Sequence, residues 1–126
     1  MTTYTCKPGH DRAAALSAAA AALAAGQLVV TPTDTVYGIA CDAFSPAAVA
    51  ALLAAKHRGP DMPVPVLVGS WQAAEDIAGE LPAAALTLMK AYWPGGLSVV
   101  VPQARSVEWD LGCLLYTSPS PRDATL

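Results

Sequence analysis

Residues 27–38 read QLVVTPTDTVYG, and this stretch decides the fold. Leu28, Val29 and Val30 form a short apolar run, which is typical of a buried strand. Pro32 has no backbone N–H to donate to a neighbouring strand, so we expect the strand to end there. The segment from Thr31 to Gly38 should then form a polar loop at the carboxyl end of that strand, where α/β sheets commonly hold ligands.

Two alanine-rich helices are expected on either side of this stretch. Asp11 can cap a helix that runs to about residue 25, and Gly26 can end it. Ser45 followed by Pro46 is a strong signal for the start of a second helix.

The same pattern continues towards the C-terminal end. Residues 65–68 (PVLV) and 97–101 (LSVVV) are candidate strands, and residues 71–79 and 82–93 are candidate helices. Because strands alternate with helices, the sequence predicts the α/β class.

The bulk composition indicates one domain without a membrane span. The chain has 126 residues, of which 54% are hydrophobic, and a formal net charge of -3. That charge argues against a protein whose whole surface binds nucleic acid. No apolar run reaches the ~18 residues of a membrane span. Three cysteines without metal-ligand spacing (Cys6, Cys41 and Cys113) fit a reducing compartment, so we expect a cytoplasmic protein.

The last fourteen letters, CLLYTSPSPRDATL, differ from the rest. Residues 113–126 show no periodicity and resemble a translated sequencing adapter, so we expect a non-native, disordered tail. Residues 1–112 are then expected to be the N-terminal portion of a truncated domain. A natural disordered tail is the alternative.

Two segments carry the polar chemistry. In residues 32–38, Thr33 and Thr35 flank Asp34, and their hydroxyls suit a substrate with an amine and a carboxylate. Lys56 and Arg58 lie two apart and can hold phosphate oxygens. The alternatives are a threonine turn for the first segment and cations that offset a helix dipole for the second.

A third segment, WPGGLS at residues 93–98, predicts a sharp turn into a strand. Gly95 and Gly96 permit close backbone approach there. Plain turn chemistry is the alternative to a functional role.

Taken in order, PTDTVYG, K-x-R-G and WPG-x-L-S resemble the YrdC-like family of threonylcarbamoyl-AMP synthases across residues 27–112. The resemblance implies a twisted, open, mixed α/β sheet with flanking helices. It also implies an ATP-dependent nucleotidyltransferase that condenses L-threonine, bicarbonate and ATP to threonylcarbamoyl-AMP and pyrophosphate. The product would serve downstream machinery that modifies adenosine 37 of tRNA.

The same resemblance assigns residues. Thr35 would contact threonine, with Thr33 and Tyr37 shaping that pocket. ATP would be bound by Lys56, Arg58 and Ser98, where Ser98 stands in place of the family's usual threonine. No catalytic residue and no resident metal ligand are assigned, so Mg²⁺ should arrive with ATP.

The chain departs from the family pattern in three places. Met62 replaces an asparagine that helps to bind nucleotide, and Leu67 replaces a histidine that approaches threonine. The family's second half, with an Arg-containing strand and a Ser-Ala-Asn motif, does not occur in this sequence, so we expect the chain alone to be inactive. The roles of Asp34 and His57 stay open.

Two other functions stay open as well. One is a module that binds double-stranded RNA or tRNA, for which steep salt dependence would be diagnostic. The other is a carbamoyl-transfer domain of hydrogenase maturation, although the zinc-finger-like motifs of that protein do not occur in this sequence.

Overall fold

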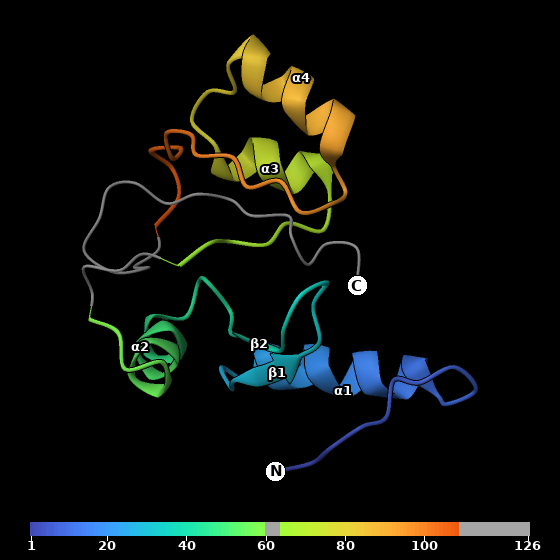
Figure 1. Ribbon diagram of the computed structural model, residues 1–126. Helices are drawn as coiled ribbons and strands as arrows, with labels where there is room; N and C mark the ends of the chain where they lie inside the picture. The colour runs from blue at the N-terminus through green and yellow to red at the C-terminus, as the bar shows by residue number, and fades with distance from the viewer. Residues whose placement is uncertain (60–63, 109–126) are drawn as a thin grey trace.

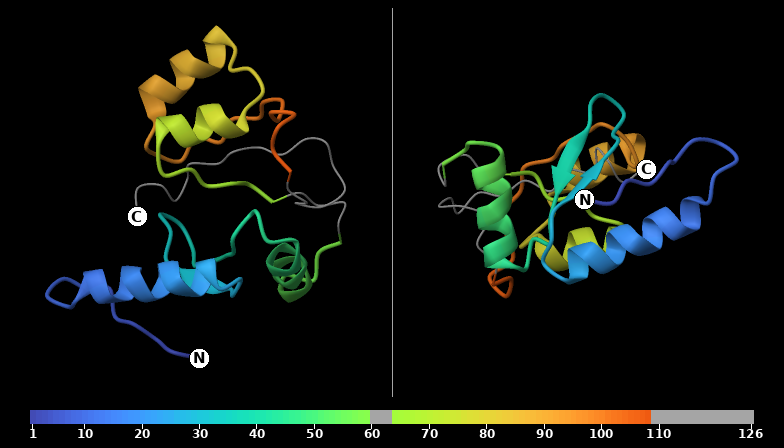
Figure 2. Two further views of the ribbon diagram at one scale, coloured as in Figure 1. Left: turned by 180° about the vertical axis from the view of Figure 1, so that it is seen from behind. Right: turned by 90° about the horizontal axis from the view of Figure 1, so that it is seen from below.

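The structure is a computed structural model that describes residues 1–59 and 64–108. Figure 1 shows two groups of elements, with α3 and α4 at one end of the molecule and the remaining four elements at the other. The view from behind in Figure 2 shows the same division. In chain order the elements are α1 (Arg12–Ala24), β1 (Val29–Thr31), β2 (Gly38–Ala40), α2 (Pro46–Ala55), α3 (Trp71–Ile77) and α4 (Ala83–Tyr92).

The helices confirm the capping signals of the sequence. The Asp11 carboxylate accepts a hydrogen bond from the Ala14 N–H at 3.0 Å, at the start of α1. Gly26 follows that helix with φ +75°, the left-handed conformation that glycine adopts without strain. The Ser45 hydroxyl caps α2 by accepting from the Ala48 N–H at 3.3 Å. Helices α3 and α4 fall inside the predicted ranges with shorter bounds.

Strand β1 pairs with a strand that the sequence reading missed. β1 and β2 run antiparallel, with Val30 opposite Ile39 and Thr31 opposite Gly38. The loop that was expected from Thr31 to Gly38 is therefore shorter, residues 32–37, because Thr31 and Gly38 pair with each other in β1 and β2. This loop leads directly into the paired strand β2. Together with the flanking helices, this pair confirms the α/β class.

The other two expected strands are wrong for the described residues. Residues 65–68 contain a single bridge residue, Val66, and residues 97–101 contain none. The second segment still alternates, because Leu97, Val99 and Val101 are wholly or partly buried while the residues between them are exposed. A strand is defined by its hydrogen-bonded partner, and the described part of the chain supplies no partner for either segment.

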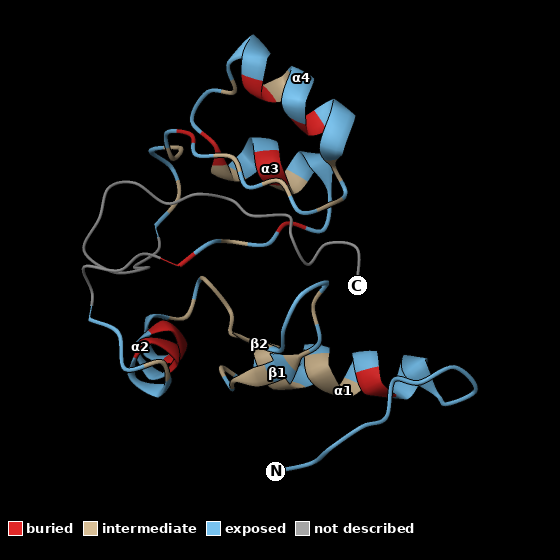
Figure 3. Ribbon diagram, viewed as in Figure 1, coloured by how far each residue is buried: buried red, intermediate tan, exposed pale blue. Residues whose placement is uncertain are grey.

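Among the described residues, the core consists of two small clusters, one at each end (Figure 3). The first cluster is built mainly from α3, α4 and residues 97–101, with Met89 almost fully buried. The second is built on α2, where Val49, Leu52 and Leu53 are buried. Five of the twelve buried hydrophobic residues in the described ranges are alanines, which bury little apolar area.

No helix within the described ranges is long and apolar enough to cross a membrane. The predictions for Met62 and for the tail at residues 113–126 lie outside the described residues.

Candidate functional site

The loop between β1 and β2 is organised by one hydroxyl group. Thr33 Oγ1 accepts hydrogen bonds from the N–H groups of Thr35 and Val36, each at 3.2 Å. The same hydroxyl donates to the Val36 carbonyl oxygen. One donor and two acceptor positions are all that a threonine hydroxyl has, so these three bonds use the full capacity of Thr33.

The other two predicted threonine ligands are freer to meet a substrate. Thr35 is exposed, and its hydroxyl oxygen lies 3.4 Å from that of Thr33. Tyr37 has 77% of its surface exposed. The loop is therefore both the threonine turn that was the alternative reading and a turn that presents Thr35 and Tyr37 to solvent.

The turn at residues 93–97 is closed by a side chain. The Trp93 indole N–H donates to the Leu97 carbonyl oxygen at 2.9 Å, and the Trp71 ring lies 5.7 Å from the Trp93 ring between centroids. Gly95 is required by space, because a Cβ there would lie 2.5 Å from the Tyr92 carbonyl oxygen. This turn precedes Ser98, which is exposed.

Two of the three motifs meet in space. The Asp34 Oδ2 atom lies 3.6 Å from the position that a Cβ of residue 96 would occupy. The loop at residues 32–37 therefore lies close to the turn at residues 93–97, although more than fifty residues separate them in the sequence.

The third motif ends α2 with a left-handed residue. The N–H of Arg58 bonds to the Leu53 carbonyl at 2.9 Å, and the N–H of His57 bonds to the Ala54 carbonyl at 3.0 Å. These two bonds form a Schellman motif, in which His57 has φ 53° where glycine is usual. Lys56 is half-buried whereas Arg58 is exposed, so the turn sends the two cations into different surroundings.

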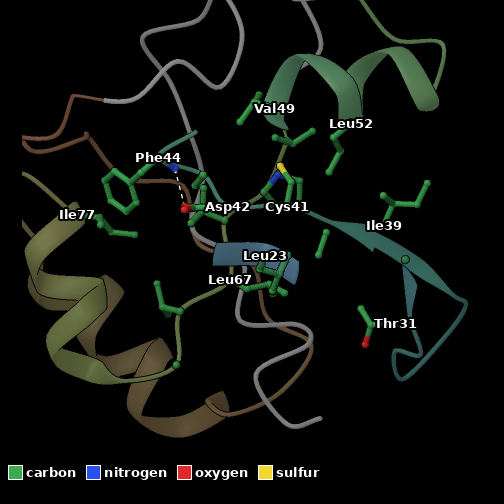
Figure 4. A pocket seen from close by; sticks show the side chains of 18 of the residues that line it. Leu23, Thr31, Ile39, Cys41, Asp42, Phe44, Val49, Leu52, Leu67 and Ile77 are labelled. Atoms are coloured by element: carbon green, nitrogen blue, oxygen red, sulfur yellow. Dashed lines mark hydrogen bonds between the residues drawn. The ribbon is translucent and has the colours of Figure 1, made fainter. Parts of the chain in front are cut away.

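A cavity of about 500 Å³ is lined by members of both hydrophobic clusters (Figure 4). Its wall is mainly apolar, with contributions from Leu23, Val49, Leu52 and Ile77. The polar or ionisable side chains on the described lining are Thr31, Cys41, Asp42 and Lys56. A largely apolar pocket with a few polar groups is the usual form of a small-molecule site.

The sequence reading found only part of this lining. Lys56 borders the cavity, but none of the other predicted site residues (Thr33, Thr35, Tyr37, Arg58 and Ser98) does. Leu67, which the resemblance flagged as a departure, also borders it. The lining residues that were not predicted are brought together by packing between distant segments. The short apolar run at residues 39–41 was the one sequence signal for them.

Cys41 is the titratable group on this wall whose environment changes its chemistry. Burial raises the pKa of the Cys41 thiol above its ordinary value, and the nearby Asp42 carboxylate adds to this rise. The Lys56 ammonium lowers the pKa of the Cys41 thiol and so partly offsets this rise.

No three His, Cys, Asp or Glu side chains gather as metal ligands within residues 1–59 and 64–108.

Comparison with known proteins decides the family. The model of the Sua5, YciO and YrdC family, described as telomere recombination, matches residues 21–114. The chain belongs to this family. The match includes all three motifs and confirms the resemblance drawn from them.

The Sua5/YciO/YrdC relatives cover most of this chain. A Mycobacterium tuberculosis protein, provisionally named a threonylcarbamoyl-AMP synthase, is 56% identical over 110 residues, which are 87% of this chain and 51% of that protein. The Bacillus subtilis threonylcarbamoyl-AMP synthase is 39% identical over 87 residues, which are 69% of this chain and 25% of the relative. The chain thus spans about half the length of the M. tuberculosis relative.

Solved structures of the Sua5/YciO/YrdC family share the fold. P. abyssi Sua5 complexed with L-threonine matches with a TM-score of 0.76 and 35% identity, over 82% of this chain and 31% of that one. A solution structure from Methanobacterium thermoautotrophicum matches with a TM-score of 0.70 and 25% identity, over 98% of this chain and 58% of that one.

Proposed function

We propose that this chain carries the threonine loop and the phosphate-binding turn of an L-threonylcarbamoyladenylate synthase. The reaction condenses L-threonine, bicarbonate and ATP to threonylcarbamoyl-AMP and pyrophosphate, which is a nucleotidyl transfer. The observation that carries the proposal is the likeness to a Sua5 protein whose structure contains L-threonine. The three ordered motifs support it.

The threonine side of the site is the loop between β1 and β2. Thr35 is the direct ligand in this proposal, because the bonds of Thr33 within the loop leave it no further capacity. Thr33 shapes the pocket by holding Thr35 in place, and the exposed Tyr37 forms part of its wall. Leu67, which stands where the family has an imidazole, lies on the wall of the cavity that Thr35 and Tyr37 do not border, so no threonine contact is assigned to it.

The nucleotide side combines Lys56, Arg58 and Ser98. The Lys56 ammonium is the cation on the described lining of the cavity, so phosphate at the cavity would meet its charge. Arg58 would bind phosphate from the solvent side in bidentate fashion. Mg²⁺ would enter as part of the ATP complex, so the ATP phosphates would take the place of most protein ligands.

The chemical step needs positioning more than a dedicated base. The threonine amine adds to bicarbonate with loss of water, which gives a carbamate. A carbamate oxygen then attacks the α-phosphorus of ATP, and the bond from that phosphorus to the bridging oxygen breaks to release pyrophosphate. Holding the two reactants together can contribute ~7–11 kcal/mol, and cations neutralise charge on the phosphates.

The proposal extends to partners that follow from the product. Threonylcarbamoyl-AMP would be consumed by machinery that modifies adenosine 37 of tRNA, in the cytoplasm. Binding to tRNA or double-stranded RNA would add a salt-dependent interaction that the synthase reaction does not require.

Turnover by the short chain alone is not part of the proposal. We infer that it is inactive, because the site residues Thr35, Tyr37 and Arg58 lie exposed rather than enclosed. Catalytic electrostatics depend on excluding water, so an open site should bind weakly and react slowly.

The test uses a chimera that joins residues 1–112 to the remaining part of the M. tuberculosis relative. We expect it to release pyrophosphate from ATP only with both L-threonine and bicarbonate, and L-serine to be a poorer substrate. The short chain is the matched control and should release none. Pyrophosphate release that ignores threonine would contradict the proposal, and RNA binding with a steep salt dependence but no such release would favour the RNA-binding module.

A further inference from the structure

Asp34 has an unusual place in the loop between β1 and β2. It lies between the two threonines of the motif, yet it does not border the cavity. Its Oδ2 atom instead stands over Gly96, at 3.6 Å from the place of a Cβ. The carboxylate therefore faces a structural turn rather than the pocket.

Both partners of this contact are held by bonds of their own. On one side, Thr33 fixes the backbone of Thr35 and Val36. On the other, the indole of Trp93 fixes the turn at residues 93–97 through the Leu97 carbonyl. The loop that carries Asp34 and the turn that carries Gly96 are thus each held by hydrogen bonds of their own.

Gly96 is open to substitution as far as its backbone is concerned. Its φ lies outside the left-handed region, which among the described glycines is occupied by Gly9 and Gly26. The atom within 4 Å of its missing Cβ, other than those of its chain neighbours, is Asp34 Oδ2. The space in front of residue 96 is therefore limited by Asp34.

We infer that Asp34 is a positioning residue that seats the threonine loop on the turn at residues 93–97. The inference rests on the proposed function and deepens it. Through this contact the loop that carries Thr35 and the segment that carries Ser98 keep a fixed spacing, so the threonine and nucleotide sides of the site act as one unit. Asp34 touches neither substrate and moves no proton.

A double-mutant cycle tests the contact. Valine at residue 96 adds a Cβ at 3.6 Å from Asp34 Oδ2 and two branches beyond it, which should crowd the carboxylate, whereas Asp34→Ala clears that space. The two changes should therefore be strongly non-additive, as is usual for residues in contact. The cycle consists of Asp34→Ala, Gly96→Val and the double variant, made in the chimera, with Asp34→Asn to separate charge from shape.

The first readout is kinetic. Gly96→Val should raise the KM for L-threonine about tenfold and the KM for ATP by less, because Ser98 follows the same turn. In the Asp34→Ala background, Gly96→Val should add less than about threefold to the KM for L-threonine. Asp34→Asn should keep more of the threonine affinity than Asp34→Ala, since the amide keeps the shape. Asp76→Ala, which removes an exposed carboxylate of α3 that belongs to neither the loop nor the turn, is the matched control and should change neither KM.

The second readout follows the loop directly. Asp34→Ala should speed hydrogen exchange at the Thr35 and Val36 amides, whereas Asp76→Ala should not. Because Asp34 is exposed, its variants should fold even if Gly96→Val does not. Hydrogen exchange at the Thr35 and Val36 amides then provides the test.

Three results would count against the inference. Additive changes in the KM for threonine would show that Asp34 and Gly96 act separately. An equal rise in both KM values would show a general structural defect. Unchanged amide exchange in Asp34→Ala would show that the Asp34 side chain does not hold the loop in place. A chimera that never responds to threonine would instead overturn the proposed function and, with it, the substrate part of this inference, while the exchange result still decides the contact.

Discussion

The Thr33 hydroxyl is hydrogen-bonded to both backbone polar groups of Val36. The Thr33 hydroxyl accepts from the Val36 N–H at 3.2 Å and donates to the Val36 carbonyl oxygen. This double contact closes the loop between β1 and β2. It gives the two threonines of the motif different roles. The Thr33 hydroxyl bonds to the backbone of the loop, whereas the Thr35 hydroxyl can still bond to a ligand.

Thr33→Val should therefore damage binding through the loop rather than by losing a substrate contact. The change leaves the N–H groups of Thr35 and Val36 to solvent and costs ~0.5–1.5 kcal/mol of stability. In the chimera, we expect a higher KM for L-threonine and faster amide exchange at both residues. Thr33→Ser, which keeps the hydroxyl, should restore both; a serine variant as poor as valine would contradict this role.

Arg58→Ala should weaken ATP binding in the chimera by ~1.5–3 kcal/mol, the cost of a lost charged hydrogen bond. Lys56→Ala should weaken it as well, because the ammonium borders the cavity. Calorimetric titration with ATP measures both variants. Arg105→Ala, which removes an exposed cation outside the motif, is the control, and equal losses in all three would indicate a nonspecific charge effect.

His57 should respond to substitution as a left-handed residue and not as a base. Its φ of 53° costs ~1–2 kcal/mol for a residue with a Cβ. His57→Gly relieves that cost, partly offset by ~0.4–1 kcal/mol of added freedom in the unfolded chain, so stability should hold or rise slightly. His57→Val should be clearly destabilising in urea unfolding. Loss of turnover in His57→Gly, with folding and ATP affinity intact, would instead favour a chemical role.

Cys41 should be alkylated more slowly than Cys6. Burial raises the pKa of the Cys41 thiol, so at neutral pH less of it is the reactive thiolate, and its rate should rise as the pH is taken upwards. Iodoacetamide labelling of the chimera, followed by peptide mass analysis, compares the two sites. ATP should slow labelling at Cys41, which lines the cavity, and leave exposed Cys6 unchanged. Faster labelling at Cys41 than at Cys6 would contradict its burial.

What the sequence predicted well was decided by neighbouring residues. Asp11 and Ser45 cap their helices within three positions, so α1 and α2 could be placed from local patterns alone. Strand β2 was missed because its apolar run is short and its identity depends on pairing with β1. Residues 97–101 have the composition and alternating burial of a strand, but strand assignment needs a partner that local sequence does not supply.

The site, like the fold, could be predicted from the sequence only where it depends on neighbouring residues. The motifs identified the loop, the turn and Lys56, each of which is a local feature. The cavity could not be predicted, since its wall joins α1, α2 and α3 through packing that only the folded chain shows. The contact between Asp34 and Gly96 was hidden for the same reason, because its two residues belong to different motifs.

The most direct test of the account is the dependence of pyrophosphate release on L-threonine when Thr35 is changed to valine. Valine keeps the shape of the side chain and removes the hydroxyl, so only the hydrogen bond to the substrate is lost. In the chimera, we predict a KM for L-threonine about tenfold higher in Thr35→Val, with the KM for ATP unchanged and partial recovery in Thr35→Ser. A Thr35→Val chimera with the unaltered KM for L-threonine would contradict the claim that this loop binds threonine.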